Sequence, residues 1–168
     1  RSELRCAVFF VSGNHEAWIG GKEMDGLGLT SSLQKLDAVR GACRSLGVHT
    51  SNRLLGADFV SPVWVTPIDS WYDGTLTLPG CEDLTADFGR WPWVDFLKCD
   101  WGPSFRPDPS DVGNGKIPMG LTEHILERNT ASINEVRSGY RSDWNGDRRP
   151  PQNVPGLITF SHFLPNQR

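Results

Sequence analysis

The sequence predicts an α/β fold, in which helices cover a sheet, and three stretches of the chain carry that prediction. Residues 4–11 are almost wholly apolar and rich in β-forming side chains, as in a strand that is buried on both faces. Residues 31–46 carry apolar side chains at helical spacing. Several short β-like runs follow between residues 48 and 66. A strand, a helix and then closely spaced strands predict a parallel sheet with an antiparallel part.

The first predicted strand runs into a tight turn. Residues 4–11 are followed by Gly13, and the turn then carries Asn14, His15 and Glu16. A glycine before Asn14 lets the backbone turn sharply and approach a ligand closely. We therefore expect three polar side chains at the end of a buried strand.

The first predicted helix has a clear start and end. Ser31 stands three residues before Gln34, which is the pattern of a capping box at a helix N-terminus. Gly47 follows the last apolar position and is expected to end the helix. Short strands are then predicted at residues 48–50, 53–55, 58–60 and 63–66.

The second half of the chain gives a weaker pattern. Residues from about 70 to 118 are rich in Pro, Gly and Trp and have few periodic apolar positions, which predicts a partly ordered insertion with at most one short helix. A helix is predicted over residues 120–137, although Asn129 makes its interior polar. A short buried strand is predicted over residues 157–160. The length of 168 residues fits one domain, residues 1–168, that contains this insertion.

Composition narrows the function classes. The net charge is -3, from 17 basic and 20 acidic residues, and no stretch concentrates enough Lys or Arg to indicate a nucleic-acid footprint. No apolar run approaches the length of a membrane span. The four cysteines are far apart, and no secretion signal is present, so an intracellular location, cytoplasmic or organellar, is favoured.

Polar residues that follow two apolar strands are the strongest candidates for chemistry. Asn14 and His15 follow the first strand, and His162 follows the last one. In open α/β sheets, ligands gather outside the carboxyl ends of strands, so these side chains can converge there. An amide oxygen and an imidazole nitrogen are both suitable ligands for a borderline divalent metal. A neighbouring imidazole could act as an acid or bind a phosphoryl oxygen.

These residues resemble a known superfamily. The tetrapeptide Gly13-Asn14-His15-Glu16 looks like the Gly-Asn-His-Asp/Glu motif of calcineurin-like metallophosphoesterases, and Ser161-His162 resembles their later strand-end histidine. An uncharacterised plant and algal branch is similar over most of the chain outside the insertion. The resemblance implies a layered α/β/β/α sandwich, here incomplete at both ends.

The resemblance also implies a role for each residue. Asn14 and His162 would bind one metal of a dinuclear pair, made of Mn, Fe or Zn, and His15 would contact the phosphate and assist departure of the leaving group. Glu16 would orient these residues without binding metal. The implied reaction is phosphoester hydrolysis by a metal-bridging hydroxide. The class of phosphorylated substrate and the oligomeric state stay open.

Several motifs of the superfamily do not occur in these 168 residues. They are an Asp-x-His, a Gly-Asp-x-x-Asp and a Gly-His-x-His segment, which would supply most of the metal ligands. We therefore expect the chain to be part of a longer hydrolase and to be inactive alone. The alternative is a non-catalytic scaffold of the same fold that binds other proteins.

Other polar and aromatic residues have plainer interpretations. Trp71 and Tyr72 follow a predicted strand, where they could wall a substrate pocket or close the core. His49 and His124 are expected to be structural or exposed residues without a role in the site.

Overall fold

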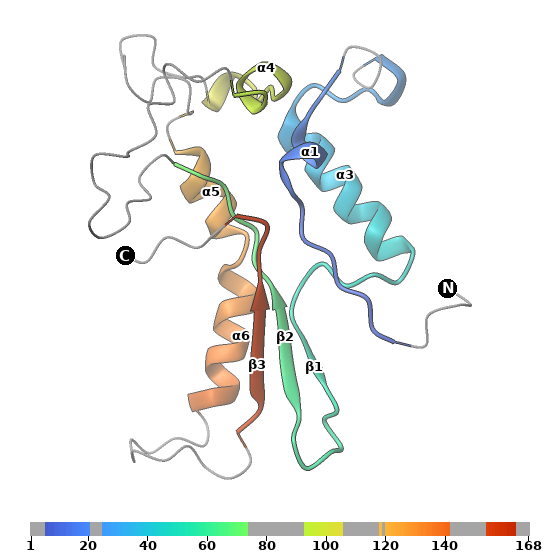
Figure 1. Cartoon of the computed structure of the whole chain (residues 1–168), viewed down its shortest axis with the longest axis vertical. Helices are drawn as coiled ribbons and strands as arrows, with labels where there is room; N and C mark the ends of the chain where they lie inside the picture. Colours follow the sequence, from blue (N-terminus) through green and yellow to red (C-terminus); the bar gives the residue numbers. More distant parts are fainter. Residues whose placement is uncertain are drawn as a thin grey trace.

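The computed structural model describes residues 6–20, 25–73, 93–105, 118, 120–141 and 154–163. Within them, helices accompany a small mixed sheet of three strands, which confirms the α/β class. Figure 1 shows helices α1, α3 and α4 at one end of the molecule and the sheet, with helix α6 beside it, at the other. Much of the predicted insertion, including residues 74–92 and 106–117, lies outside the described residues.

Helix α3 (Ser32–Ser45) confirms the predicted first helix. Ser31 is its N-cap, and the Ser31 side chain accepts a hydrogen bond from the backbone N–H of Gln34. The Gln34 side chain bonds back to the backbone N–H of Thr30 at 2.7 Å, one residue before the position that a capping box would use. Gly47 follows the helix with a φ of 78°, a left-handed conformation that glycine adopts readily.

The sheet has the order β1-β2-β3. Strand β1 (Arg53–Leu55) pairs antiparallel with β2 (Val63–Pro67), and β2 pairs in parallel with β3 (Gly156–Phe160). Three of the predicted strands are thus confirmed in position. The burial predicted for the strand at residues 157–160 is wrong, because residues 156–159 of β3 are exposed in the structure. The strand predicted at residues 58–60 is wrong, because Gly56 has a φ of 65° and starts a turn that Phe59 closes with a 2.8 Å backbone hydrogen bond.

The strand predicted at residues 4–11 is much shorter in the described part of the chain. Residues 6–11 form a single parallel bridge, between Phe9 and His49, made by two backbone hydrogen bonds. None of these side chains is fully buried, so the prediction of a strand buried on both faces is wrong for this part. The same bridge is the only pairing of the strand predicted at residues 48–50 among the described residues.

The helix predicted over residues 120–137 is two helices, α5 (Leu121–Glu127) and α6 (Thr130–Arg141). Asn129 lies between them and is only 4% exposed. Its amide accepts from the backbone N–H of Asp69 and donates to the Asp69 carbonyl, at 2.8 Å each. The polar side chain in the predicted helix therefore binds the segment that leaves β2.

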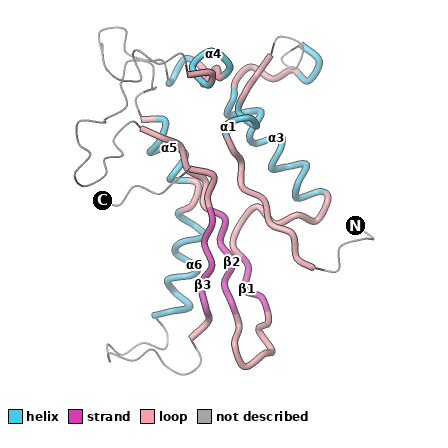
Figure 2. The backbone as a smooth tube through the Cα atoms, viewed as in Figure 1, coloured by secondary structure: helices cyan, strands magenta, loops and turns pink. Residues whose placement is uncertain are grey.

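The core that positions the candidate site combines residues from distant parts of the sequence. Helix α1 (Asn14–Ala17) contributes Ala17, α3 contributes Leu36, and Trp71 packs edge-on against Trp101. The described part of the insertion adds the short helix α4 (Asp95–Lys98) and the 3-10 turn η2 (Pro103–Phe105), in accord with the short helix predicted there. Figure 2 shows the described segment that leads into α1 as a loop rather than a strand.

Candidate functional site

Helix α1 begins at the predicted Gly-Asn-His-Glu turn. Gly13 is its N-cap, and the Glu16 carboxylate accepts a hydrogen bond from the Gly13 backbone N–H at 2.7 Å. A carboxylate in this position satisfies a backbone donor that the helix leaves free. Glu16 therefore holds the turn that presents Asn14 and His15.

The side chain of Asn14 lies between two partners that are far away in the sequence. Its Nδ2 donates to both carboxylate oxygens of Asp95, at 3.0 and 3.3 Å. Its Oδ1 lies 3.1 Å from Nε2 of His162. Because Nδ2 is the donor to Asp95, the oxygen is the atom that faces His162, whose Nε2–H tautomer would donate to it.

His162 is brought to Asn14 by the carboxyl end of β3. The Ser161 hydroxyl donates to the backbone carbonyl of Phe163 at 2.6 Å, which bends the chain just beyond the strand. A Cβ atom at position 13 would lie 2.8 Å from two atoms of the His162 ring, closer than side chains approach one another. The absence of a side chain at Gly13 therefore permits the approach of His162.

His15 follows Asn14 on α1 but turns to a different partner. The ring is exposed and stacks on Trp18, with ring centroids 3.8 Å apart and planes 26° apart. Stacking restricts the ring to one plane and leaves its edge open to solvent.

A buried carboxylate that we did not predict from the sequence lies next to Asn14. Asp95 is only 2% exposed and accepts hydrogen bonds from four side chains. Besides Asn14, the donors are the indole N–H of Trp18 at 2.5 Å, that of Trp93 at 3.0 Å and the hydroxyl of Tyr72 at 3.2 Å. Two indoles and a phenol gathered on one acceptor satisfy the buried charge.

The two aromatic residues proposed for a substrate loop have different positions. Trp71 is buried in the core, where it packs against Trp101 and Phe163. Tyr72 is half-buried, and burial, together with the charge of Asp95, raises the pKa of its hydroxyl far above the usual value. Tyr72 therefore stays a hydrogen-bond donor to Asp95, which also accepts from Asn14.

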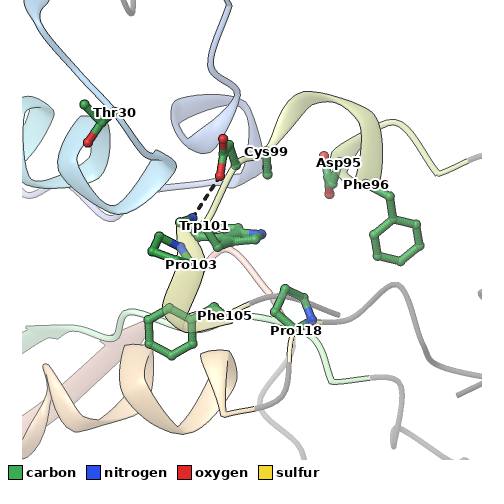
Figure 3. Close-up of a pocket in the computed structure, with 10 residues that line it drawn as sticks. Thr30, Asp95, Phe96, Cys99, Trp101, Pro103, Phe105 and Pro118 are labelled. Carbon is green, nitrogen blue, oxygen red and sulfur yellow. Dashed lines mark hydrogen bonds between the residues drawn. The ribbon is translucent and has the colours of Figure 1, made fainter. Parts of the chain in front are cut away.

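A cavity of about 390 Å³ adjoins Asp95 on the side of α4 and η2. Figure 3 shows Phe96, Trp101 and Phe105 around it. Cys99 also lines it, but burial and the charge of Asp95 raise the pKa of that thiol to about 12. The thiol is thus protonated at neutral pH and is a poor nucleophile.

The donor atoms that could hold a metal are Oδ1 of Asn14 and Nε2 of His162. In the part of the chain that the structure describes, no group of three or more His, Cys, Asp or Glu side chains is arranged to hold an ion. Nor does any helix of this part have the length and apolar character needed to cross a membrane.

His49 and His124 lie apart from Asn14 and His162. The His49 ring contacts Phe9 and Arg53, and the His124 ring contacts Phe105.

A comparison with protein-family models, curated proteins and solved structures finds no match for the chain.

Proposed function

We propose that the chain forms part of a metal-dependent phosphoesterase in which Asn14 and His162 bind one metal ion and His15 contacts the phosphate. The observation that supports this most is the meeting of Asn14 and His162, which are 148 residues apart in sequence. Both follow an extended segment, and His162 lies just beyond the carboxyl end of β3, where α/β proteins commonly bind ligands.

The two donor atoms fit a metal ion in chemistry and in spacing. Neighbouring ligand atoms around an octahedral ion with bonds of about 2.1 Å lie about 3 Å apart. Oδ1 of Asn14 and Nε2 of His162 are 3.1 Å apart, so both could contact one ion in place of the proton that they share. When bound, the metal would activate water as a Lewis acid and neutralise charge on the phosphate.

The chain's own side chains would have separate tasks in this reaction. Exposed His15, held in plane by Trp18, would donate a proton to the leaving oxygen. Glu16 would keep the turn in place through the Gly13 N–H. The other ligands of a pair of Mn, Fe or Zn ions would come from outside the described residues.

The architecture that agrees with this function is the layered α/β/β/α sandwich of metallophosphoesterases. Strands β2 and β3 are parallel, and His162 lies just beyond the carboxyl end of β3. We propose that the three strands belong to one sheet of such a sandwich.

The test measures hydrolysis of an aryl phosphate with added Mn²⁺. It uses the longest protein that the natural coding sequence yields, because the chain alone is expected to bind a metal pair poorly. His15→Ala should lower the rate about 10²- to 10⁴-fold by removing the acid. His162→Ala should lower metal affinity by more than the roughly 10- to 100-fold that is typical when a residue supporting a ligand is lost, because His162 would bind the metal directly.

His124→Ala is the matched control, because His124 lies on α5 and contacts Phe105 rather than the site. It should leave the rate unchanged. A folded protein that hydrolyses no phosphoester with Mn²⁺, Fe²⁺ or Zn²⁺ would contradict the proposal and favour the non-catalytic scaffold. Equal losses of rate in His15→Ala and His124→Ala would contradict the role proposed for His15.

A further inference from the structure

We propose that Asp95 is the positioning residue that fixes the amide of Asn14, so that its carbonyl oxygen, rather than its NH₂ group, faces the metal position beside His162. This inference rests on the proposed function and adds a residue to it. Asp95 belongs to the insertion, where no pattern in the sequence indicates a role in the site.

An asparagine amide has two ends of opposite character. The oxygen can bind a cation, whereas the NH₂ group repels one, and a rotation of 180° exchanges them. A free Asn14 would therefore present the wrong end for part of the time. Something must hold the amide before the ion arrives.

Asp95 is suited to this task because its carboxylate can only accept. Both of its oxygens lie within 3.3 Å of Asn14 Nδ2, so a rotated amide would place oxygen against a buried carboxylate. That contact would cost the hydrogen bonds and add repulsion. The orientation with Oδ1 toward His162 is therefore strongly favoured.

Asp95 is itself held in place. Trp18 donates to Oδ1, and Trp93 and Tyr72 donate to Oδ2, so the carboxylate cannot rotate without losing them. The backbone supports the same arrangement, because the Ile19 N–H donates to the Lys98 carbonyl at 2.7 Å and joins the segment after α1 to α4. Side chains that support a ligand in this way commonly change metal affinity about 10- to 100-fold.

The experiment places one substitution, Asp95→Asn, in two backgrounds and measures Mn²⁺ affinity by electron paramagnetic resonance. In the wild-type background, Asp95→Asn should weaken binding about tenfold, because an amide in place of the carboxylate can pair with either orientation of Asn14. In the Asn14→Asp background, the same substitution should strengthen binding about tenfold, because it removes one of two carboxylates that would face each other.

The reversal of sign separates positioning from a structural role. If Asp95 only stabilises the fold, Asp95→Asn weakens binding in both backgrounds, and that result would overturn the inference. Asp100→Asn is the matched control, since Asp100 is exposed and accepts from the Gly102 N–H. It should change affinity less than about twofold in either background.

A second measurement does not need metal. The side-chain NH₂ signals of Asn14, identified by their loss in Asn14→Ala, should show slow proton exchange that Asp95→Asn accelerates at least about tenfold. Unchanged exchange in a folded Asp95→Asn chain would overturn the inference. If the wild-type protein binds no Mn²⁺ but Asp95→Asn still accelerates the exchange, the result would contradict the proposed function while supporting the orientation of Asn14 by Asp95.

Discussion

The region around Asp95 and the three-stranded sheet are held together by different interactions. Around Asp95, four side-chain donors meet one carboxylate that is 2% exposed. One of these donors, Tyr72, stacks on Trp71, which packs edge-on against Trp101. We therefore expect the stability of this region to depend strongly on the single residue Asp95.

The three strands of the sheet are joined by backbone pairings along their length. Strand β1 pairs with β2 from Arg53 opposite Val65, and β2 pairs with β3 up to Pro67 beside Phe160. Most side chains of β3 are exposed to solvent. Leu157 is 49% exposed and Ile158 is 55% exposed. We therefore expect every side chain of β3 to contribute less to the free energy of unfolding than Asp95 does.

The candidate site joins the two regions. Asn14 belongs to the region of Asp95, and His162 extends from β3. One half of the site is thus fixed by directional hydrogen bonds, and the other half follows the end of a strand. Substitutions in the first half should therefore change the free energy of unfolding more than substitutions in the second half.

Asp95→Ala should have the largest effect on stability. It leaves three part-buried N–H groups and one part-buried hydroxyl without the acceptor that they share, and we expect a loss of about 3–5 kcal/mol in the free energy of unfolding. Urea denaturation measures it, with exposed Asp100→Ala as the control at less than about 1 kcal/mol. Equal losses in the two variants would show that Asp95 is not the centre of this region.

Gly13→Ala should affect the contact between the two regions. The new methyl group would lie 2.8 Å from the His162 ring, which is exposed and can move away, so we expect a loss of about 1 kcal/mol and a shifted His162 ring signal. Gly41→Ala is the control, because Gly41 lies in α3 with open space around it. It should stabilise the chain by up to about 1 kcal/mol.

Alkaline pH should weaken the Asp95 region. Burial raises the pKa of the Cys99 thiol from 9.0 to about 12, so the folded chain keeps a proton that the unfolded chain releases above pH 9. The contribution of this thiol to the free energy of unfolding is fully present below that pH and is lost as the pH rises from 9 toward 12. The loss is at most about 1.4 kcal/mol per pH unit. Urea denaturation at several pH values should show a shallower fall in Cys99→Ala, and an unchanged slope would contradict this account.

Ile158→Thr should have the smallest effect. The side chain is more than half exposed, and threonine keeps the β-branched shape that suits a strand. We expect a change within about 0.5 kcal/mol by urea denaturation. A loss above about 2 kcal/mol would mean that the Ile158 side chain is buried in solution, in contradiction to its exposure in the structure.

Local patterns in the sequence predicted the local parts of the fold. Helix α3 followed from its cap at Ser31, its apolar spacing and Gly47, all of which act within one segment. The division between α5 and α6 did not follow, because Asn129, which lies between the two helices, binds the backbone of Asp69, 60 residues away. Features that depend on neighbouring residues could be predicted, and features that depend on residues far away in the sequence could not.

The candidate site shows the same division. Asn14, His15 and His162 could be predicted because each follows an apolar segment, and Asn14 and His162 meet as expected, whereas His15 stacks on Trp18. Asp95 could not be predicted, because its importance comes from donors up to 81 residues away and its own segment has no periodic pattern. The sequence shows that Trp18, Trp93 and Tyr72 are present, but no pattern in it indicates that they bind the same acceptor.

The most direct test of the central claim is a Mn²⁺ titration followed by nuclear magnetic resonance of the histidine rings and the Asn14 side chain. A bound Mn²⁺ ion broadens the signals of nearby nuclei. We predict that the signals of His162 and Asn14 broaden together at the lowest Mn²⁺ concentrations, while the His49 and His124 signals stay sharp. Equal broadening of all of these signals, or a His162 signal that stays sharp, would contradict a metal site between Asn14 and His162.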